Sequence, residues 1–563
     1  MMKIFPKPFF WLMMIFTIAI GIRIWYFPHD VPIVTDGFYS FVYAVKTVFD
    51  GSLPVGYTTT NTGWSNFLSL FFVFSDTSDP LHLMDIQRTL SIILSTITII
   101  PAFFIFRRFV DTRWALFGSF LLVVEPRLLL MSLEGINYLL FFFLFVLTIA
   151  LFLKKTDNSL FLSFACISCA ALVRYEGLLL LIPLSIMYFL KFKDKRSIVR
   201  FLGMIFVLII ILVSVASIRM EATENLCYES YVGTICGQDG ISHNILGAPM
   251  FIEKHVISGI PDSDDKIYNK TGISALDKFT YLSLSNLVKF LGLSLIPFFI
   301  FFIILGLGIF MKNIKFPKLG FGKVTILLTT CIMLLPAIYA YGRGIEEIRY
   351  VLIIIPILCI LSISGISSTS FKISKSNGAL IILIILIMSS SIIFIESEKR
   401  DSIHDRESFL ISQKIVGLTN VISTFNQDGY VKPAILSPNS TVLLEVGENG
   451  KLVSDIKRVS TTNYHDLEEF IVDSEKSGLR YMVVDEDNDL FKNNGKVRAI
   501  KQLNLRQDIV MIGDGYTDYE VYGNGVAKEF ICYTENISRK RVIEKSDYVA
   551  HNFYDVIDII NQL

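Results

Sequence analysis

The feature that most constrains this chain is a series of long apolar stretches. About eleven of them hold ~17–22 residues each, enough to cross ~30 Å of hydrocarbon as an α-helix. Because lipid offers the backbone no hydrogen-bonding partners, each stretch is expected to be helical. The expected spans are 9–27, 88–106, 114–131, 136–153, 159–173, 177–190, 201–218, 290–310, 324–341, 350–366 and 378–395. The spans 159–173 and 177–190 are short and could be tilted halves around a break, so the count could change by one.

Basic residues indicate the orientation, because short cytoplasmic loops are rich in Lys and Arg. They gather before the first span and after the second, fourth, sixth, eighth and tenth. We therefore expect a multi-pass cell-membrane protein with a cytoplasmic amino terminus. The loops 28–87 and 219–289 and everything after 395 are expected outside. The three Asn-X-Ser/Thr sequons, at Asn269, Asn439 and Asn536, all fall in these outside segments.

Composition excludes two classes of protein, and the cysteines do not indicate a metal site. Hydrophobic residues make up 53% of the chain and the formal net charge is zero, which excludes a basic nucleic-acid-binding protein and a disordered chain. Cys166 and Cys169 have CxxC spacing inside an apolar helix, where packing is a better interpretation than zinc binding. Cys227 and Cys236 share an outside loop and could form a disulfide in an oxidising compartment.

The chain divides into three expected regions. Residues 1–395 form the membrane domain, and the segment 38–49 in its first outside loop is typical of an amphipathic helix on the bilayer surface. Residues 396–494 predict a soluble α/β domain, with strands at 434–446 and 479–485 and a helix at 464–477. Residues 495–563 form a distinct tail.

Four polar clusters lie at the outside ends of the expected spans. They are Thr35-Asp36-Gly37-Phe38-Tyr39; Glu125-Pro126-Arg127 with Glu134, in the expected tight turn between spans three and four; Arg174-Tyr175-Glu176; and Arg343-Gly344-Ile345-Glu346-Glu347-Ile348-Arg349-Tyr350. Charges in a membrane domain are costly and usually functional.

This inventory suits an enzyme that uses a lipid-phosphate donor. Such an enzyme needs a carboxylate to take a proton from an acceptor hydroxyl. It also needs arginines to hold a phosphate as negative charge develops on the leaving group. Each cluster also has a simpler interpretation, because an Asp beside Gly is often a turn former and an Arg at a membrane interface is often an anchor. The occurrence of all four clusters on one side favours catalysis.

Over residues 1–490 the chain resembles the GT-C glycosyltransferases, polytopic enzymes that include the protein O-mannosyltransferases and the lipid A aminoarabinose transferases. The resemblance rests on TDGFYSFVYAVKTVFDGSLP and TGWSNF in the first loop, EPRLLLMSLEG, LVRYEGLLL and RGIEEIRYVLIIIPIL. It implies a sugar transferred with inversion from a polyprenyl- or dolichyl-phosphate donor to a protein, lipid or glycan acceptor outside the cell.

The resemblance also implies roles for particular residues. The family's loop acid maps onto Asp36 as general base. Arg174, Arg343 and Arg349 are candidates to bind the donor phosphate, and Glu176 and Glu346 to orient them. Gly37 stands where a second acid is usual in the family, which counts against a metal-assisted mechanism. No cofactor is certain, and a divalent metal stays open. The soluble domain has no WWDYG-like motif, which counts against the oligosaccharyltransferase branch.

The tail resembles the C-terminal part of phosphoserine phosphatases of the haloacid dehalogenase superfamily. The resemblance rests on Gly495-Lys496-Val497, DIVMIGDGYTDYEV and AKEFICYTENISRKRVIEKSDYVAHNF. It implies a phosphoryl-steadying role for Lys496, a magnesium-holding role for Asp514 and a nearby acid in Asp518. The nucleophile candidates Asp485 and Asp487 lie too close to Lys496 for the intervening family elements. We therefore expect half of a phosphatase core, without activity.

Two other functions remain as alternatives. A lipid or sugar transporter predicts charges buried in mid-span and broken helices at matching positions of two halves. An active phosphatase predicts magnesium-dependent phosphate release by the soluble part.

Overall fold

The computed structural model describes residues 8–33, 36–54, 62–75, 79–223, 275–297, 299–300, 320–368, 377–398, 434–435, 457–458, 495–502, 508–535 and 538–563, with the single residues Ile303 and Arg406. The chain forms two compact units, Met1–Ser402 and Ile403–Leu563. The expected sequons, the Cys227–Cys236 pair, the strand 479–485, the helix 464–477 and most of the span 290–310 lie outside the described residues.

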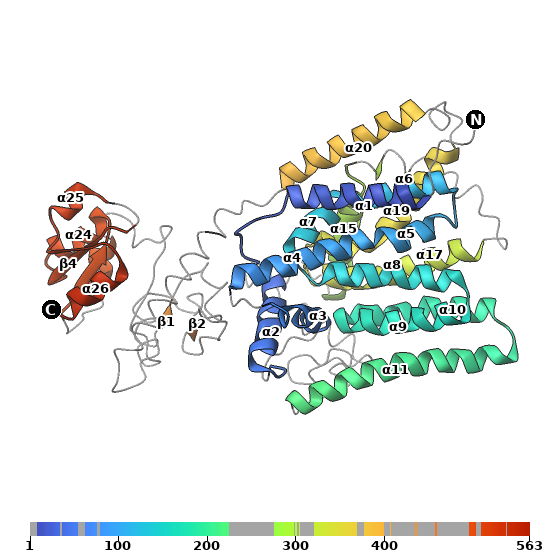
Figure 1. Cartoon of the computed structure of the whole chain (residues 1–563), viewed down its shortest axis with the longest axis horizontal. Coiled ribbons are helices and arrows are strands. Elements are labelled where there is room, and N and C mark those ends of the chain that lie inside the picture. The colour runs from blue at the N-terminus through green and yellow to red at the C-terminus, as the bar shows by residue number, and fades with distance from the viewer. Residues whose placement is uncertain are drawn as a thin grey trace. The chain divides into compact units, whose positions relative to one another are not determined.

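The first unit is a bundle of helices, and the protein is a polytopic helical membrane protein (Figure 1). Its helices are α1 Pro8–Trp25, α2 Asp36–Asp50, α3 Gly63–Phe72, α4 Pro80–Ile97, α5 Ile99–Phe106, α6 Thr112–Val123, α7 Pro126–Glu134, α8 Tyr138–Lys154, α9 Asp157–Val173, η1 Tyr175–Leu180, α10 Leu181–Lys191, α11 Lys195–Thr223, α15 Ala275–Ser294, α17 Phe321–Met333, α18 Leu335–Gly342, η4 Ile348–Ile354, α19 Ile355–Ser368 and α20 Asn377–Glu398.

Most of the expected spans coincide with these helices. In the described part, six helices are long and apolar enough to cross a membrane, or seven if the bent pair α6–α7 counts as one span. The helices α8 and α9, with 17 residues each, are apolar but shorter. The count of eleven therefore stays a prediction, while the polytopic helical architecture is confirmed.

The short spans 159–173 and 177–190 are two segments joined at a break. Helix α9 begins with a capping box between Thr156 and Ser159. It ends at Val173 because Arg174 is extended, with φ −148° and ψ 124°. The chain then re-enters helical structure through the 3₁₀ segment η1 and α10. This break places the charged segment Arg174-Tyr175-Glu176 between two apolar helices.

The expected place of Glu125-Pro126-Arg127 in a tight turn between spans three and four is wrong, because these residues lie at the bend between α6 and α7. Glu125 caps this helix by accepting a hydrogen bond from the Leu128 N–H at 2.8 Å, and Pro126 is its first residue. Gly135 ends it in the left-handed conformation, with φ +68°. Helices α6 and α7 meet at a bend of 50°. The capping residues Glu125 and Gly135 thus divide the expected span 114–131 into two helices and extend the second one to Glu134.

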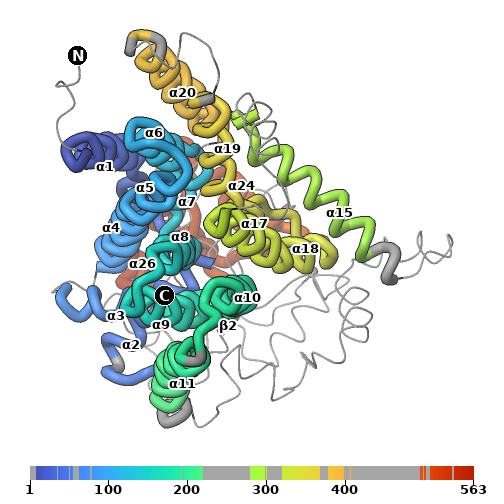
Figure 2. Tube along the Cα trace, turned by 90° about the vertical axis from the view of Figure 1, so that its right-hand side faces the viewer, coloured from blue at the N-terminus to red at the C-terminus, as the bar shows by residue number. Residues whose placement is uncertain are grey.

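Figure 2 looks along the bundle and shows how the helices surround one another. Helix α8 packs against α9, which packs in turn against α11, and α4 contacts α7 and α8. Helices α2 and α3 lie across one end of the bundle (Figure 1), with α3 in contact with α9. The expected amphipathic segment 38–49 is helical and buries Phe38, Phe41 and Val42.

In the second unit, β1 (Ala434–Ile435) pairs in parallel with β2 (Lys457–Arg458), which confirms the beginning of one expected strand. The tail holds a parallel sheet in the order β3–β4–β5, formed by Val510–Gly513, Glu529–Tyr533 and Tyr548–Ala550. Its helices are α23 Gly495–Gln502, α24 Tyr516–Gly523, α25 Lys540–Ile543 and α26 Phe553–Ile560.

Strand β4 lies at the centre of the tail's sheet and is buried on both faces. Phe530 and Cys532 pack with Val542 of α25, whereas Ile531 packs with Val556 of α26. The alternation follows from the two-residue period of a strand. The described part of the tail is therefore a small α/β layer with helices on both sides.

Candidate active site at one end of the helix bundle

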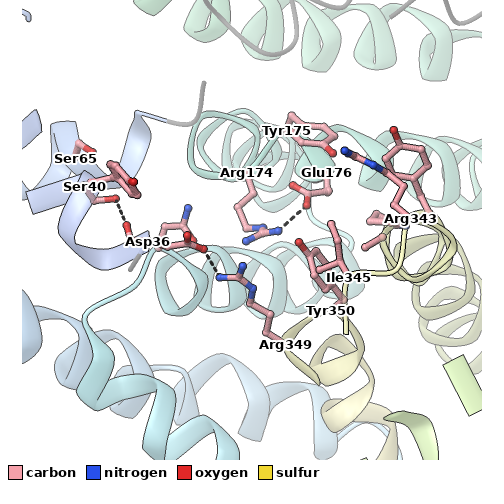
Figure 3. A pocket seen from close by; sticks show the side chains of 15 residues that line it. Asp36, Ser40, Ser65, Arg174, Tyr175, Glu176, Arg343, Ile345, Arg349 and Tyr350 are labelled. Atoms are coloured by element: carbon pink, nitrogen blue, oxygen red, sulfur yellow. Dashed lines mark hydrogen bonds and ion pairs between the residues drawn. The ribbon is translucent and has the colours of Figure 1, made fainter. Parts of the chain in front are cut away.

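Three of the polar clusters meet at one cavity of about 320 Å³. Asp36, Arg174, Glu176, Arg343 and Arg349 all line it. They come from α2, the α9–η1 break, the end of α18 and η4. In the view of Figure 3, Asp36 and Ser40 lie on one side, Arg343 on the other, and Arg174 and Arg349 between them. The cavity thus combines two carboxylates with three guanidinium groups.

Arg174 is held by its own segment. Its Nη2 donates to Glu176 Oε1 at 2.7 Å, and both side chains are largely buried, with 13% and 7% of their surface exposed. The guanidinium also lies 5.7 Å from the ring centre of Tyr350. Gly177 permits this arrangement, since a Cβ at that position would lie 2.6 Å from the backbone carbon of Ala170. The predicted pairing of Glu176 with an arginine is therefore present.

Arg349 links the base candidate to the arginine cluster. Its Nη1 lies 2.5 Å from Asp36 Oδ2, a contact between residues far apart in the sequence. Its Nε pairs with Glu347, and its guanidinium carbon lies 5.6 Å from the Tyr350 ring centre. The Asp36 side chain is 54% exposed, whereas Arg349 is 17% exposed. Asp36 is thus both anchored by Arg349 and accessible from the cavity.

Arg343 is the exposed cation of the site. Its guanidinium carbon lies 5.8 Å from the Tyr339 ring centre, and within the described part of the chain it pairs with no acid. An exposed guanidinium beside two largely buried ones suits an anion that enters from solvent or from the membrane surface.

The structure places Glu346 away from this cavity. Its carboxylate pairs with Lys289 of α15 at 2.5 Å, and both side chains are about half exposed. Its neighbour Glu347 contacts Arg349 instead. An orienting role for Glu346 stays a prediction that this geometry does not support.

The Glu125–Arg127 cluster also lies apart from the lining residues. Arg127 contacts Glu125 at 3.2 Å and donates to the carbonyls of Leu293 and Ile296, at 2.8 and 2.6 Å. Both side chains are buried. This cluster joins α7 to the end of α15, a structural role.

Sequence reasoning did not single out several polar residues that line the cavity. They are Ser65 of α3, Ser40 of α2, Tyr339 of α18 and Asn137 before α8. Hydroxyl and amide groups are common in amphipathic segments, so they gave no signal until the elements were brought together. They supply hydrogen-bonding groups of the kind that a sugar requires.

Among the described residues, no group of three or more His, Cys, Asp or Glu side chains is arranged to hold a metal ion. At the cavity the described partner of Asp36 is a cation, Arg349, and not a second carboxylate.

The tail brings its phosphatase-like residues together. Lys496 Nζ lies 2.5 Å from Asp518 Oδ1, and Asp518 Oδ2 accepts from the Gly515 N–H at 3.0 Å. Asp514, at the end of β3, lies 3.9 Å from Arg539. Burial, with smaller contributions from the carboxylates of Asp514 and Asp518, raises the pKa of the Cys532 thiol.

The bundle and its cavity can be compared with the arrangement that the sequence analysis expects. A polytopic helical membrane domain with a loop acid and several arginines at one end is the arrangement expected of GT-C enzymes. Comparison with solved structures confirms that the chain has the GT-C fold.

The structure is similar to the oligosaccharyltransferase of Archaeoglobus fulgidus in complex with zinc and sulfate. The TM-score is 0.53 at 13% identity, over 87% of this chain and 69% of that one. The same enzyme tethered with an acceptor peptide gives a TM-score of 0.53 at 13% identity, over 88% and 71%. At this identity the likeness concerns the fold alone, so it does not assign the chain to the oligosaccharyltransferase branch.

The tail has a separate likeness. A stretch of 84 residues, 14% of this chain, is 31% identical to the chloroplastic phosphoserine phosphatase of Arabidopsis thaliana. The match spans only 28% of that protein. No family model matches the chain.

Proposed function

We propose that this protein is a membrane glycosyltransferase. It takes a sugar from a polyprenyl- or dolichyl-phosphate donor and passes it, with inversion, to an acceptor on the outer face of the cell membrane. One observation carries the proposal: Asp36, Arg174, Arg343 and Arg349, from four separate segments, line one cavity in a GT-C fold. The sugar and the acceptor, whether protein, lipid or glycan, are not specified by these contacts.

In the proposed reaction Asp36 acts as general base. It takes the proton of an acceptor hydroxyl, and the electron pair of that oxygen forms a bond to the anomeric carbon of the sugar. The bond from that carbon to the phosphate oxygen breaks, and its electron pair remains on the leaving lipid phosphate. Attack opposite the leaving group accounts for inversion.

The arginines stabilise the charge that develops on the phosphate. Guanidinium groups match phosphate oxygens with paired N–H donors and keep their charge at any working pH. Arg174 is already oriented by Glu176, so little reorganisation is needed when the phosphate binds. In Arg349, Nη1 contacts Asp36 and Nε contacts Glu347. The Nη2 group can then donate hydrogen bonds to a ligand.

The solved relatives support this proposal by what they bind. One oligosaccharyltransferase structure contains sulfate, an anion with the shape of a phosphate group, and the other carries an acceptor peptide. A pocket for an anion beside a place for an acceptor is what the proposed reaction requires of this chain.

The test is transfer of label by the purified protein. The protein in lipid nanodiscs is incubated with radiolabelled polyprenyl-phosphate sugars and membrane extracts, and transferred label is measured. Asp36→Asn is the test variant. Asp30→Asn is the matched control, because Asp30 is an exposed acid of the same loop whose φ of +57° asparagine readily adopts. Transfer that is lost in Asp36→Asn and kept in Asp30→Asn supports the proposal, and equal transfer by both variants refutes it.

For the tail we propose a fold without phosphatase activity. Lys496 and Asp518 satisfy each other, and the residues that would supply a nucleophile do not have the family's spacing. A phosphatase of this type needs an Asp to accept the phosphoryl group.

A further inference from the structure

One face of α4 is bonded to the segment that carries Asp36. Gln87 is fully buried, and its Nε2 donates to two carbonyls, that of Gly37 at 3.0 Å and that of Gly135 at 2.7 Å. Gly37 directly follows Asp36 in the first turn of α2, and Gly135 ends α7. A single amide group therefore joins the base-bearing turn to the turn before α8.

These two turns are too close for a side chain at position 37. A Cβ there would lie 2.9 Å from the carbonyl oxygen of Glu134 and 2.6 Å from Ile33 Cγ2. The first contact is with backbone, which cannot swing away. Glycine is thus required for the approach that lets Gln87 reach both carbonyls.

Other side chains bond to these two turns or to the residues just before them. Met84 Sδ accepts from the Ile33 N–H at 3.2 Å, and Arg88 Nε donates to the Leu133 carbonyl at 3.0 Å. Trp64 of α3, also fully buried, donates to the Gly135 carbonyl at 2.9 Å. Met84, Gln87 and Arg88 follow the i, i+3, i+4 spacing that places residues on one face of a helix. Of the three α4 side chains, Gln87 bonds nearest to Asp36.

We propose that Gln87 is a positioning residue for the reaction: it fixes the first turn of α2 so that the Asp36 carboxylate points into the cavity. This inference rests on the proposed role of Asp36 as base. Gln87 does not line the cavity, so it acts through the backbone of Gly37. The Asp36 carboxylate itself contacts Arg349, which must also serve the donor phosphate.

The expected kinetic effect of losing Gln87 is a fall in kcat. Methionine keeps the length of the side chain and removes both N–H donors, so Gln87→Met frees the turn without creating a large cavity. Misplacement of a reacting group by about 1 Å can cost about 10²-fold in rate. We expect kcat to fall by about 10- to 100-fold. The donor KM should change little, because Arg174 and Arg343 lie on other elements.

Ser91→Ala is the matched control. Ser91 lies one turn further along α4, is equally buried, and its hydroxyl has no hydrogen-bond partner among the described residues. The control should keep the parent kcat and KM. A fall of the same size in both variants would indicate general damage to α4 and overturn the proposal.

Gln87→Glu adds a readout that a merely structural role would not move. A glutamic acid can donate to a carbonyl only when it is protonated, whereas its carboxylate would repel both carbonyls. Its turnover, divided by that of the parent, should therefore fall as pH rises. A ratio that does not change with pH would overturn the proposal, and this variant also serves if Gln87→Met does not fold.

A measurement without substrate separates this inference from the proposed function. Hydrogen exchange of the amides of 36–42 should be faster in Gln87→Met than in the parent, and unchanged in Ser91→Ala. Unchanged exchange in Gln87→Met would show that Gln87 does not hold the first turn of α2, and it would overturn the proposal even if activity falls. If exchange is faster in Gln87→Met but the parent protein transfers no sugar, the proposed function is refuted, whereas the hydrogen-bonded link between Gln87 of α4 and Gly37 of α2 still holds.

Discussion

Arg349→Lys tests whether the arginine that holds Asp36 also serves the donor. Lysine keeps the positive charge but loses the planar set of donors that contacts Asp36 and Glu347 together and lies beside the Tyr350 ring. An ammonium can hold one of these partners and leave the other. The substitution therefore removes geometry while preserving net charge.

The size of the effect follows from the burial of the two partners. Asp36 is 54% exposed, so its pair with Arg349 is screened and contributes only ~0.2–1 kcal/mol to stability. A hydrogen bond from a largely buried guanidinium to a charged phosphate contributes about 1.5–3 kcal/mol. Since 1.4 kcal/mol is tenfold, one lost bond should lower the donor kcat/KM by about 10- to 150-fold.

The assay is transfer of label at varied donor concentration, with the thermal midpoint measured in parallel. Arg200→Lys is the control, because Arg200 pairs with Asp157 at the opposite end of α9 from Arg174. Substitution of this partly exposed residue, which does not line the cavity, should change donor kcat/KM by no more than about twofold. If donor kcat and KM are unchanged in Arg349→Lys and also in Arg174→Lys, these arginines are interface anchors and the reasoning fails.

Four further outcomes are expected. Asp36→Asn should lower turnover by ~10²–10⁴-fold while donor binding persists, and a change of only a few-fold would remove Asp36 as base. Transfer should continue in EDTA, because Asp36 faces a guanidinium and position 37 has no room for a second acid; loss of activity that Mg²⁺ or Mn²⁺ restores would contradict this. An impermeant thiol reagent should label the cysteine of Ser440→Cys in intact cells, because this segment is expected outside. Labelling of that cysteine only after lysis would contradict the expected orientation. The full chain should release no phosphate from phosphoserine with magnesium, whereas hydrolysis that Asp514→Asn abolishes would make the protein bifunctional.

Helix positions could be predicted from hydropathy because lipid imposes a length and a composition on each span. The break at Arg174 was visible for the same reason, as a charged segment between two short apolar stretches. The bend between α6 and α7 was not, because its signal lies in the local capping of α7 by Glu125. Hydropathy over a long window averages such signals away.

The members of the site could be predicted, but not their pairings. Charge at one end of a bundle identified Asp36, Arg174 and Arg349 as candidates, since such residues are costly unless they are used. Which acid meets which arginine depends on how η4 packs against the rest of the bundle. Glu346 and Glu347 are neighbours in the sequence, yet one faces Lys289 and the other Arg349. In a segment that mixes loop and 3₁₀ structure, the sequence does not predict the direction in which each side chain points.

Gly37 shows how a departure from a family pattern becomes intelligible in three dimensions. In the sequence it is the absence of a second acid beside Asp36. In the structure a side chain there would meet the Glu134 carbonyl at 2.9 Å, and the space is used for the approach of α2 to the Gly135 turn. The same approach brings the Gly37 carbonyl within 3.0 Å of the Gln87 amide. Placing an acid at this position in Gly37→Glu should therefore break the hydrogen bond between Gln87 and the Gly37 carbonyl. We expect this variant to lower turnover, with or without added metal.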